Sequence, residues 1–192
     1  MKVQDIKLSE NNIKEILKYF TFDISQFKET FSKLKQYCVY FKFIDLTNED
    51  ILFMKNILVD ENQYNSTLPI IIYRGIKISD EMFQKIKKKQ PKSYTPQKIN
   101  YSSWSINLKV AKEFSFTIDK GVIFKSTLTS KNKFISIIKY QIICYNLKNY
   151  LLDKKTKLTK LENIILDLVT IPIINEEEVL VFDKIKIDKI LY

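Results

Sequence analysis

The apolar residues in the first sixty positions recur at intervals of three and four, which is the spacing of amphipathic helices. One set follows Ser9 and a second follows Asp23, and both residue types commonly begin helices. We therefore expect two helices, with inward positions Ile13, Ile16, Leu17 and Phe20 in the first and Ile24, Phe27, Phe31, Leu34 and Cys38 in the second. Thr47 predicts the start of a third helix, and a turn-like stretch over residues 60–69 follows it. The inward positions of this third helix are Ile51, Met54, Ile57 and Leu58.

From Leu68 onward the apolar residues gather in short β-branched runs. The run LPIIIYRG over residues 68–75 predicts a strand that ends at a glycine. A short helix capped by Ser79 is expected next, with Met82, Phe83 and Ile86 inward. We interpret residues 85–97 as a basic, proline-containing loop, with a dedicated anion-binding patch as the alternative.

The rest of the chain predicts two helices among several strands. Asn107 is the expected cap of a short helix whose inward residues are Val110, Ala111 and Phe114. A later helix is expected to begin at Thr156 and to carry Leu158, Leu161, Ile165 and Leu168. Strands are expected over residues 121–129, 133–138, 176–182 and 184–192, the last two antiparallel. The lysine-rich residues 148–160 are expected to form a surface insertion.

Helices early and strands late predict an α+β fold, with two packed antiparallel β-sheets preceded by amphipathic helices. At 192 residues we expect one domain over residues 1–192, with a helical part at 1–60 and a core at 68–192. We also expect a monomer.

Composition narrows the chemistry that this chain can perform. It contains no histidine, which excludes Ser-His-Asp and Cys-His catalysis and histidine-bearing metal sites, and we expect no bound metal. Cys38 and Cys144 lie in apolar settings and are expected to be buried free thiols, with a disulfide or metal pair as the alternative. There is no apolar run near 18 residues and no apolar segment at the start, so we expect neither a membrane span nor a secretion signal. We expect a cytoplasmic protein, or one delivered into the cytosol of a host cell.

The charge balance favours an anionic partner. The net charge is +10 and the sequence pI about 9.3, which suits nucleic acid, a phosphate-bearing ligand or a membrane surface. Arg74 is the only arginine among 32 basic residues. Because a planar guanidinium binds phosphate in a two-pronged way that lysine cannot, Tyr73-Arg74-Gly75 indicates a phosphate site, where Gly75 lets a ligand approach the backbone. A structural salt bridge is the alternative.

Two further segments could carry chemistry. In the run YSSWS, strand alternation puts Ser103 and Ser105 on one face and Trp104 on the other, so the hydroxyls could orient a ligand or a carboxylate. A serine-rich turn is the alternative. On the last predicted strands, Glu176 and Glu178 would share a face roughly 7 Å apart, an arrangement that indicates a functional carboxylate pair. Acidic residues flanking an apolar strand for solubility are the alternative.

In this order the three motifs resemble the Arg-Ser-Glu class of mono-ADP-ribosyltransferases, which includes clostridial toxin catalytic domains and arginine-specific vertebrate ectoenzymes. The resemblance covers residues 68–187, and the predicted helical start matches helices that commonly precede the family's core. It implies an ADP-ribosyltransferase-like core. It also implies transfer of ADP-ribose from NAD to a protein, most often onto arginine, with release of nicotinamide.

The resemblance also implies roles for individual residues. It assigns NAD contacts to Arg74, with Tyr73 and Gly75 beside it. Ser103 would support the catalytic carboxylate and, with Ser105, contact NAD.

In the same resemblance Glu178 is the catalytic glutamate. Glu176 occupies the position that accompanies transfer to arginine, and residues 170–175 form the substrate-recognition turn. The chain departs from the family pattern at Trp104, where threonine is usual, in the lack of an aromatic residue in that turn, and in its longer lysine-rich stretch. Three alternatives stay open: an acceptor that is nucleic acid, hydrolysis of NAD with water as the acceptor, and a basic binding module without enzymatic activity.

Overall fold

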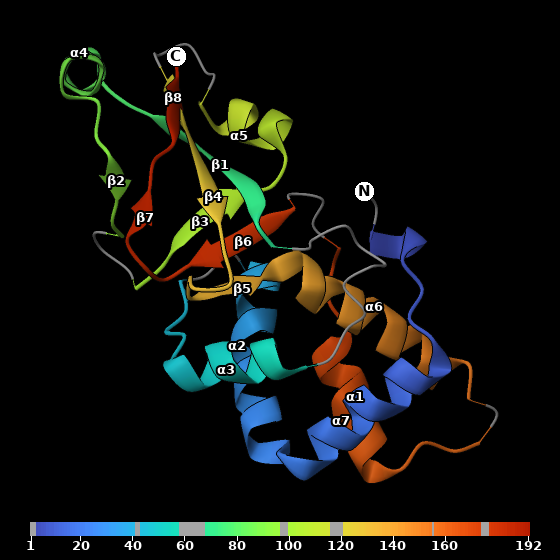
Figure 1. Ribbon diagram of the computed structural model, residues 1–192. Coiled ribbons are helices and arrows are strands. Elements are labelled where there is room, and N and C mark those ends of the chain that lie inside the picture. Colours follow the sequence, from blue (N-terminus) through green and yellow to red (C-terminus); the bar gives the residue numbers. More distant parts are fainter. Residues whose placement is uncertain are drawn as a thin grey trace. The chain divides into compact units, whose positions relative to one another are not determined.

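The computed structural model describes residues 3–40, 43–57, 68–96, 100–115, 121–154, 156–173 and 177–192 (Figure 1). These residues form a mixed α+β protein with a large antiparallel sheet and a small second sheet. The chain divides into two compact units, Met1–Asn65 with Ile137–Asn175 and Ser66–Ser136 with Glu176–Tyr192. Residues 137–175 therefore group with the N-terminal helices, and the expected continuous core over residues 68–192 is interrupted by them.

The first unit is helical. It contains the short helix η1 (Val3–Asp5), followed by α1 (Glu10–Phe22), α2 (Ile24–Tyr40), α3 (Asn48–Asn56), α6 (Ile137–Leu152) and α7 (Lys160–Val169). Ser9 caps α1 by accepting the backbone N–H of Asn12, and Thr47 caps α3 in a reciprocal capping box with Asp50. The first three predicted helices and their starts are confirmed, except that Leu58 lies outside the described residues. No helix among the described residues has the length and apolar character needed to cross a membrane.

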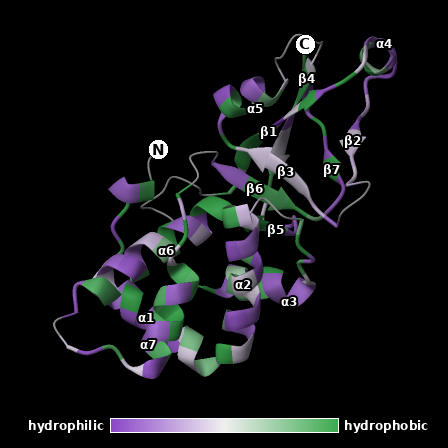
Figure 2. Cartoon of the chain, turned by 180° about the vertical axis from the view of Figure 1, so that it is seen from behind, coloured by the Kyte–Doolittle hydropathy of each residue, from purple (hydrophilic) through white to green (hydrophobic). Residues whose placement is uncertain are grey.

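Aromatic rings fill the centre of the helical unit. The Phe20 and Phe27 rings stack at 4.0 Å between centroids, and Phe31 meets the edge of Tyr140 at 5.0 Å. Purple and green residues alternate along α1 in Figure 2, which is the pattern that made this helix predictable. Cys38 and Cys144 are buried here as thiols outside any disulfide among the described residues, as expected, and burial raises the pKa of the Cys144 thiol well above its usual value.

Two predictions about the region of helix α6 are wrong. Buried residues occur on all its sides, so the periodicity of a half-exposed helix is missing, and its start was assigned to a strand over residues 133–138. Only Phe134–Ser136 is a strand (β5), and the helix begins at Ile137. The proposed surface insertion over residues 148–160 is also wrong at its start, because Leu151 belongs to α6 and is buried. α7 starts at Lys160 behind the cap Thr159, later than the expected start at Thr156.

A buried carboxylate ties α2 to α3. Asp50 is fully buried and accepts hydrogen bonds from the Thr30 hydroxyl at 2.7 Å and from Lys33 Nζ at 2.9 Å. The backbone N–H of Thr47 donates to the same carboxylate at 2.8 Å. Burial by itself raises the pKa of Asp50, but these hydrogen bonds, the one from Lys33 first, outweigh it and hold the pKa below its usual value.

The second unit holds the strands. Its six-stranded sheet has the order β5-β6-β3-β1-β4-β8, all neighbours antiparallel, and β2 pairs with β7 in a second, two-stranded sheet. The remaining strands of the large sheet are β1 (Ile70–Lys77), β3 (Ser102–Ser105), β4 (Gly121–Leu128), β6 (Glu178–Val181) and β8 (Lys189–Leu191). The small sheet consists of β2 (Ser93–Tyr94) and β7 (Ile185–Lys186), and the helices are α4 (Asp80–Lys89) and α5 (Leu108–Ser115).

Two parts of this unit differ from the sequence prediction. The basic loop expected over residues 85–97 is helical as far as Lys89 and then contributes β2, because α4 continues past its buried Ile86 with lysines on its solvent side. The expected final strand over residues 184–192 divides into β7 and β8, which belong to different sheets.

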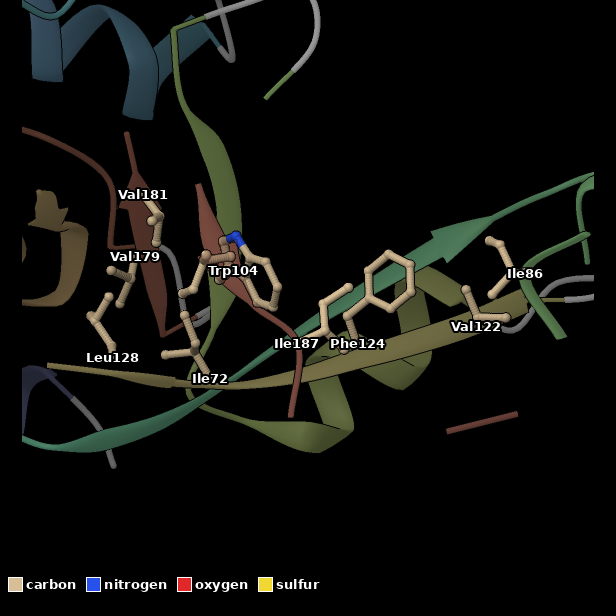
Figure 3. Packing of buried hydrophobic residues seen from close by; sticks show 10 residues of the cluster. Ile72, Ile86, Trp104, Val122, Phe124, Leu128, Val179, Val181 and Ile187 are labelled. Atoms are coloured by element: carbon tan, nitrogen blue, oxygen red, sulfur yellow. The ribbon is translucent and has the colours of Figure 1, made fainter. Parts of the chain in front are cut away.

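Apolar residues from both sheets of this unit form one cluster (Figure 3). In that view Trp104 lies between the valines of β6 and Phe124 of β4. Trp104 is 1% exposed, and its ring meets the edge of Tyr94 from the small sheet at 5.9 Å. The two sheets therefore pack on each other through aromatic contacts.

Candidate functional site

Arg74, Ser103 and Glu178, one residue from each predicted motif, lie on three neighbouring strands, in the order β6-β3-β1. Tyr73 of β1 pairs with Ser105 of β3, and Ser105 pairs with Glu178 of β6. Residues that pair across antiparallel strands point to the same face of a sheet. By this register the side chains of Tyr73, Ser103, Ser105 and Glu178 share one face, while Trp104 points to the other, as the alternation in YSSWS predicted.

A direct hydrogen bond joins the serine and the glutamate. The Ser103 hydroxyl donates to Oε1 of Glu178 across 75 residues of sequence. Glu178 is only 7% exposed, so its carboxylate has little access to water and depends on donors from the protein. The serine thereby fixes the orientation of a carboxylate that is partly withdrawn from solvent.

The Arg74 guanidinium reaches the backbone of Ser103, although the Arg74 side chain leaves β1 on the opposite face of the sheet. Arg74 pairs with Phe124 on β4, a member of the buried apolar cluster, so its side chain starts on the core face of the sheet. Its guanidinium Nη1 donates to the backbone carbonyl of Ser103, and its Nε is buried without a hydrogen-bond partner among the described residues. This arginine is not tied into a salt bridge within the described part of the chain.

Residues of all three strands line one cavity of about 230 Å³. Its lining residues are Tyr73, Arg74, Gly75, Ser103, Trp104, Ser105, Val110, Ala111, Phe114 and Glu178. Phe114 was expected to face inward, but it is 53% exposed and forms part of the cavity wall. It lies in the last turn of α5, the helix that packs beside β1, and it borders the cavity from there. The residues around this cavity therefore carry a carboxylate, a guanidinium and an exposed aromatic ring.

The other two serines of β3 have local partners. The Ser102 hydroxyl accepts the indole N–H of Trp104 at 2.8 Å, which satisfies the one polar atom of a buried ring. The Ser105 hydroxyl accepts the backbone N–H of Asn107 at 3.0 Å, and the Asn107 side chain accepts the backbone N–H of Lys109. Asn107 thus starts α5 as predicted, and Ser105 shapes the turn between β3 and this helix.

Gly75 is explained by helix packing. A Cβ atom at this position would lie 1.8 Å from the backbone carbonyl oxygen of Ala111 in α5. The glycine therefore lets α5 approach β1, a reason different from the ligand approach that the sequence suggested, although Gly75 also borders the cavity.

The segment before Glu178 departs from the expected strand. β6 begins at Glu178 itself, and Glu177 has a φ of 50°, in the left-handed region. Strand alternation therefore does not extend back through Glu177, and the argument that put Glu176 and Glu178 on one face is not valid. Glu176 lies outside the described residues, as do the last two positions of the expected recognition turn over residues 170–175.

Sequence reasoning missed Tyr94. Its ring lies against the Arg74 guanidinium, with the Cζ atom 5.0 Å from the ring centroid. The only available signal was a tyrosine within the basic segment after α4, which gave no indication of its partner.

No protein-family model matches this sequence, and no curated protein or solved structure matches it either. Function is therefore inferred from the residues of the cavity and their geometry.

Proposed function

We propose that this chain is an NAD-dependent mono-ADP-ribosyltransferase with an ADP-ribosyltransferase-like core, which transfers ADP-ribose to arginine on a protein acceptor. The observation that carries the proposal is the series of contacts from Arg74 through Ser103 to Glu178, made across three adjacent strands at one cavity. The reaction would take place in a cytosol, either of the protein's own cell or of a host.

The cavity suits one end of NAD. Small-molecule sites commonly have volumes of about 300 to 1,000 Å³, so a cavity of about 230 Å³ would enclose the nicotinamide and its ribose and leave the adenosine outside. The half-exposed ring of Phe114 offers a flat apolar surface for a planar base. The guanidinium of Arg74, which donates through Nη1 to the Ser103 carbonyl, would supply its remaining terminal N–H donors to the pyrophosphate.

Glu178 is the proposed catalytic residue. Breaking the bond between nicotinamide and C1 of the ribose passes through an oxocarbenium-like state, which a carboxylate hydrogen-bonded to the ribose 2′-hydroxyl stabilises. The electron pair of that bond moves onto the ring nitrogen, so a cationic pyridinium departs as neutral nicotinamide and needs no general acid. A nitrogen of the acceptor guanidinium then bonds to C1 and gives up a proton, for which Glu176 is the proposed base.

A second candidate acceptor is nucleic acid. The unit that holds the cavity, Ser66–Ser136 with Glu176–Tyr192, contains 17 basic and 9 acidic residues, a net charge of +8 out of the chain's +10. Such a concentration of positive charge favours polyanions as well as NAD itself.

The deciding experiment incubates the purified chain with NAD labelled in the adenylate part and with separate pools of protein, RNA and DNA. Label on protein, removable under conditions that cleave arginine-linked ADP-ribose, supports the lead proposal, and label on nucleic acid supports the second. Free ADP-ribose alone would indicate a glycohydrolase. No loss of NAD in any pool would refute the enzymatic proposal.

Variants of the three consecutive glutamates sharpen this test. Glu178→Gln should reduce both transfer and NAD hydrolysis about 10²-fold or more, because it removes the charge that stabilises the oxocarbenium-like state. Glu176→Gln should abolish arginine modification and keep appreciable hydrolysis. Glu177→Gln is the matched control and should change neither. Equal losses in all three variants would contradict the assignment of separate roles.

A further inference from the structure

We propose that Tyr94 is a positioning residue for Arg74, and that the two-stranded sheet is thereby part of the ligand site. The inference rests on the proposed function only for the identity of the ligand, NAD. What it adds is the residue that holds the lone arginine in place, supplied by a strand outside the three motifs.

The geometry starts from a row of side chains on the core face of the large sheet. Arg74 of β1 pairs with Phe124 of β4, and continuing the Tyr73–Ser105 register places Trp104 of β3 on its other side. The Tyr94 ring touches all three members of this row. Its centroid lies 5.0 Å from Arg74 Cζ and 5.9 Å from the ring centroids of both Trp104 and Phe124.

The two aromatic neighbours hold the Tyr94 ring firmly. Trp104 and Phe124 are 1% and 3% exposed, and the Tyr94 and Trp104 rings meet at an interplanar angle of 89°. Tyr94 is further fixed through its backbone, because β2 pairs with β7 at Tyr94 and Ile185. A ring clamped in this way presents an ordered π surface to the guanidinium.

Arg74 needs such support. Among the described residues its guanidinium donates one hydrogen bond, to the Ser103 carbonyl, and its Nε has no partner. A ring over one face of the guanidinium attracts the cation and restricts its rotation, and it leaves the N–H groups at the edge free to bind an anion. Tyr94 therefore orients Arg74 for the phosphates and itself touches no reacting atom.

The lone arginine allows a test that requires no NAD. Phenylglyoxal adds to arginine side chains, so in this chain the arginine adduct, measured by mass spectrometry, reports Arg74 alone. The proteins compared are the wild type, Tyr94→Phe, Tyr94→Leu and Arg74→Lys, which gives the background from the amino groups. Tyr192→Leu is the matched control, because it removes a ring of the same unit that packs on Phe83.

Tyr94→Phe keeps the ring and should label at the wild-type rate within about twofold, whereas Tyr94→Leu should label about three to ten times faster. Tyr192→Leu should not change the rate. A wild-type rate in Tyr94→Leu, or equal acceleration in Tyr94→Phe, would overturn the inference. If circular dichroism shows that Tyr94→Leu is unfolded, pentafluorophenylalanine at position 94 keeps the ring's shape and reverses the charge of its face, and the same faster labelling is expected.

Calorimetry with NAD separates this inference from the proposed function. NAD should bind Tyr94→Leu about five times more weakly than the wild type, with Tyr94→Phe close to the wild type. In an Arg74→Lys background Tyr94→Leu should cause no further loss. If the wild type binds no NAD, the proposed function fails, and the labelling rates still decide whether Tyr94 positions Arg74.

Discussion

Ser103→Ala should impair catalysis much more than stability, while Ser102→Ala, one residue away, should do the opposite. The two hydroxyls have different partners. Ser103 donates to the Glu178 carboxylate at the cavity, and Ser102 accepts the indole N–H of the buried Trp104. The pair of variants therefore compares the same chemical change on the two faces of one strand.

The magnitudes follow from these partners. A hydrogen bond to a charged group contributes about 1.5 to 3 kcal/mol, so its loss from Glu178 in the transition state lowers the rate roughly ten- to a hundredfold or more. Stability should fall by less than about 1 kcal/mol, because Ser103 is only partly buried and a water molecule in the adjoining cavity can replace its hydroxyl. Ser102 is 2% exposed, so Ser102→Ala leaves a buried indole N–H unpaired and should cost about 1 to 3 kcal/mol.

Two measurements test the predicted difference between Ser103→Ala and Ser102→Ala. Urea unfolding gives the free energy of unfolding of each variant, and nicotinamide release at saturating NAD gives turnover per folded molecule. Ser105→Ala serves as a third comparison, since its hydroxyl accepts the Asn107 N–H at the start of α5. Normal turnover in folded Ser103→Ala would refute the catalytic role, as would a stability loss equal to that of Ser102→Ala without a loss of turnover.

Gly75→Ala should lower the free energy of unfolding by about 1 to 3 kcal/mol or more, because its methyl group would lie 1.8 Å from the Ala111 carbonyl oxygen; a urea titration that matches the wild type would show that α5 is not packed this closely. The Asp50 carboxyl has a folded-state pKa below its usual value, so its stabilisation is present above the unfolded pKa of about 3.9 and is lost as the pH falls through the lower folded value. Asp50→Asn should therefore be less stable than the wild type by about 1.5 to 3 kcal/mol at pH 7, and a difference that does not shrink on acidification to pH 2 would argue against this linkage. Cys38 and Cys144 should react with a thiol reagent only after denaturation, since both are buried and burial raises the pKa of the Cys144 thiol; rapid reaction of the native protein would contradict that placement.

Local physics made much of the helical unit predictable. Ser9 and Thr47 each accept a backbone N–H within the next three residues, so the signal and the contact that it predicts lie next to each other in sequence. The apolar spacing of α1 reflects burial of a single face. The same logic fails for α6, which is buried on all sides and offers no periodicity, so that its β-branched start was assigned to a strand.

The candidate site was also predictable only in part. The residue types were visible in sequence: one arginine in a β-branched run, serines alternating with a tryptophan, and a glutamate before an apolar run. The strand expected to end at Gly75 in fact continues to Lys77, so Arg74 lies within it. The contacts between these residues could not be predicted from sequence. Arg74 and Ser103 are 29 positions apart and Ser103 and Glu178 are 75 apart, and only the strand order β6-β3-β1 makes them neighbours. Strand order depends on how the whole unit buries its apolar faces, which no local pattern encodes.

Three details belong to the tertiary structure alone. Gly75 is required by a helix that arrives about 36 residues later in the chain, which only the packed backbone shows. Glu177 leaves the extended conformation just before Glu178, so the two-residue alternation that sequence reasoning relied on does not apply there. Tyr94 contacts Arg74 because residues of two separate sheets pack against each other in one cluster. No sequence pattern indicates such a contact, since the two side chains come from strands that are not paired with each other.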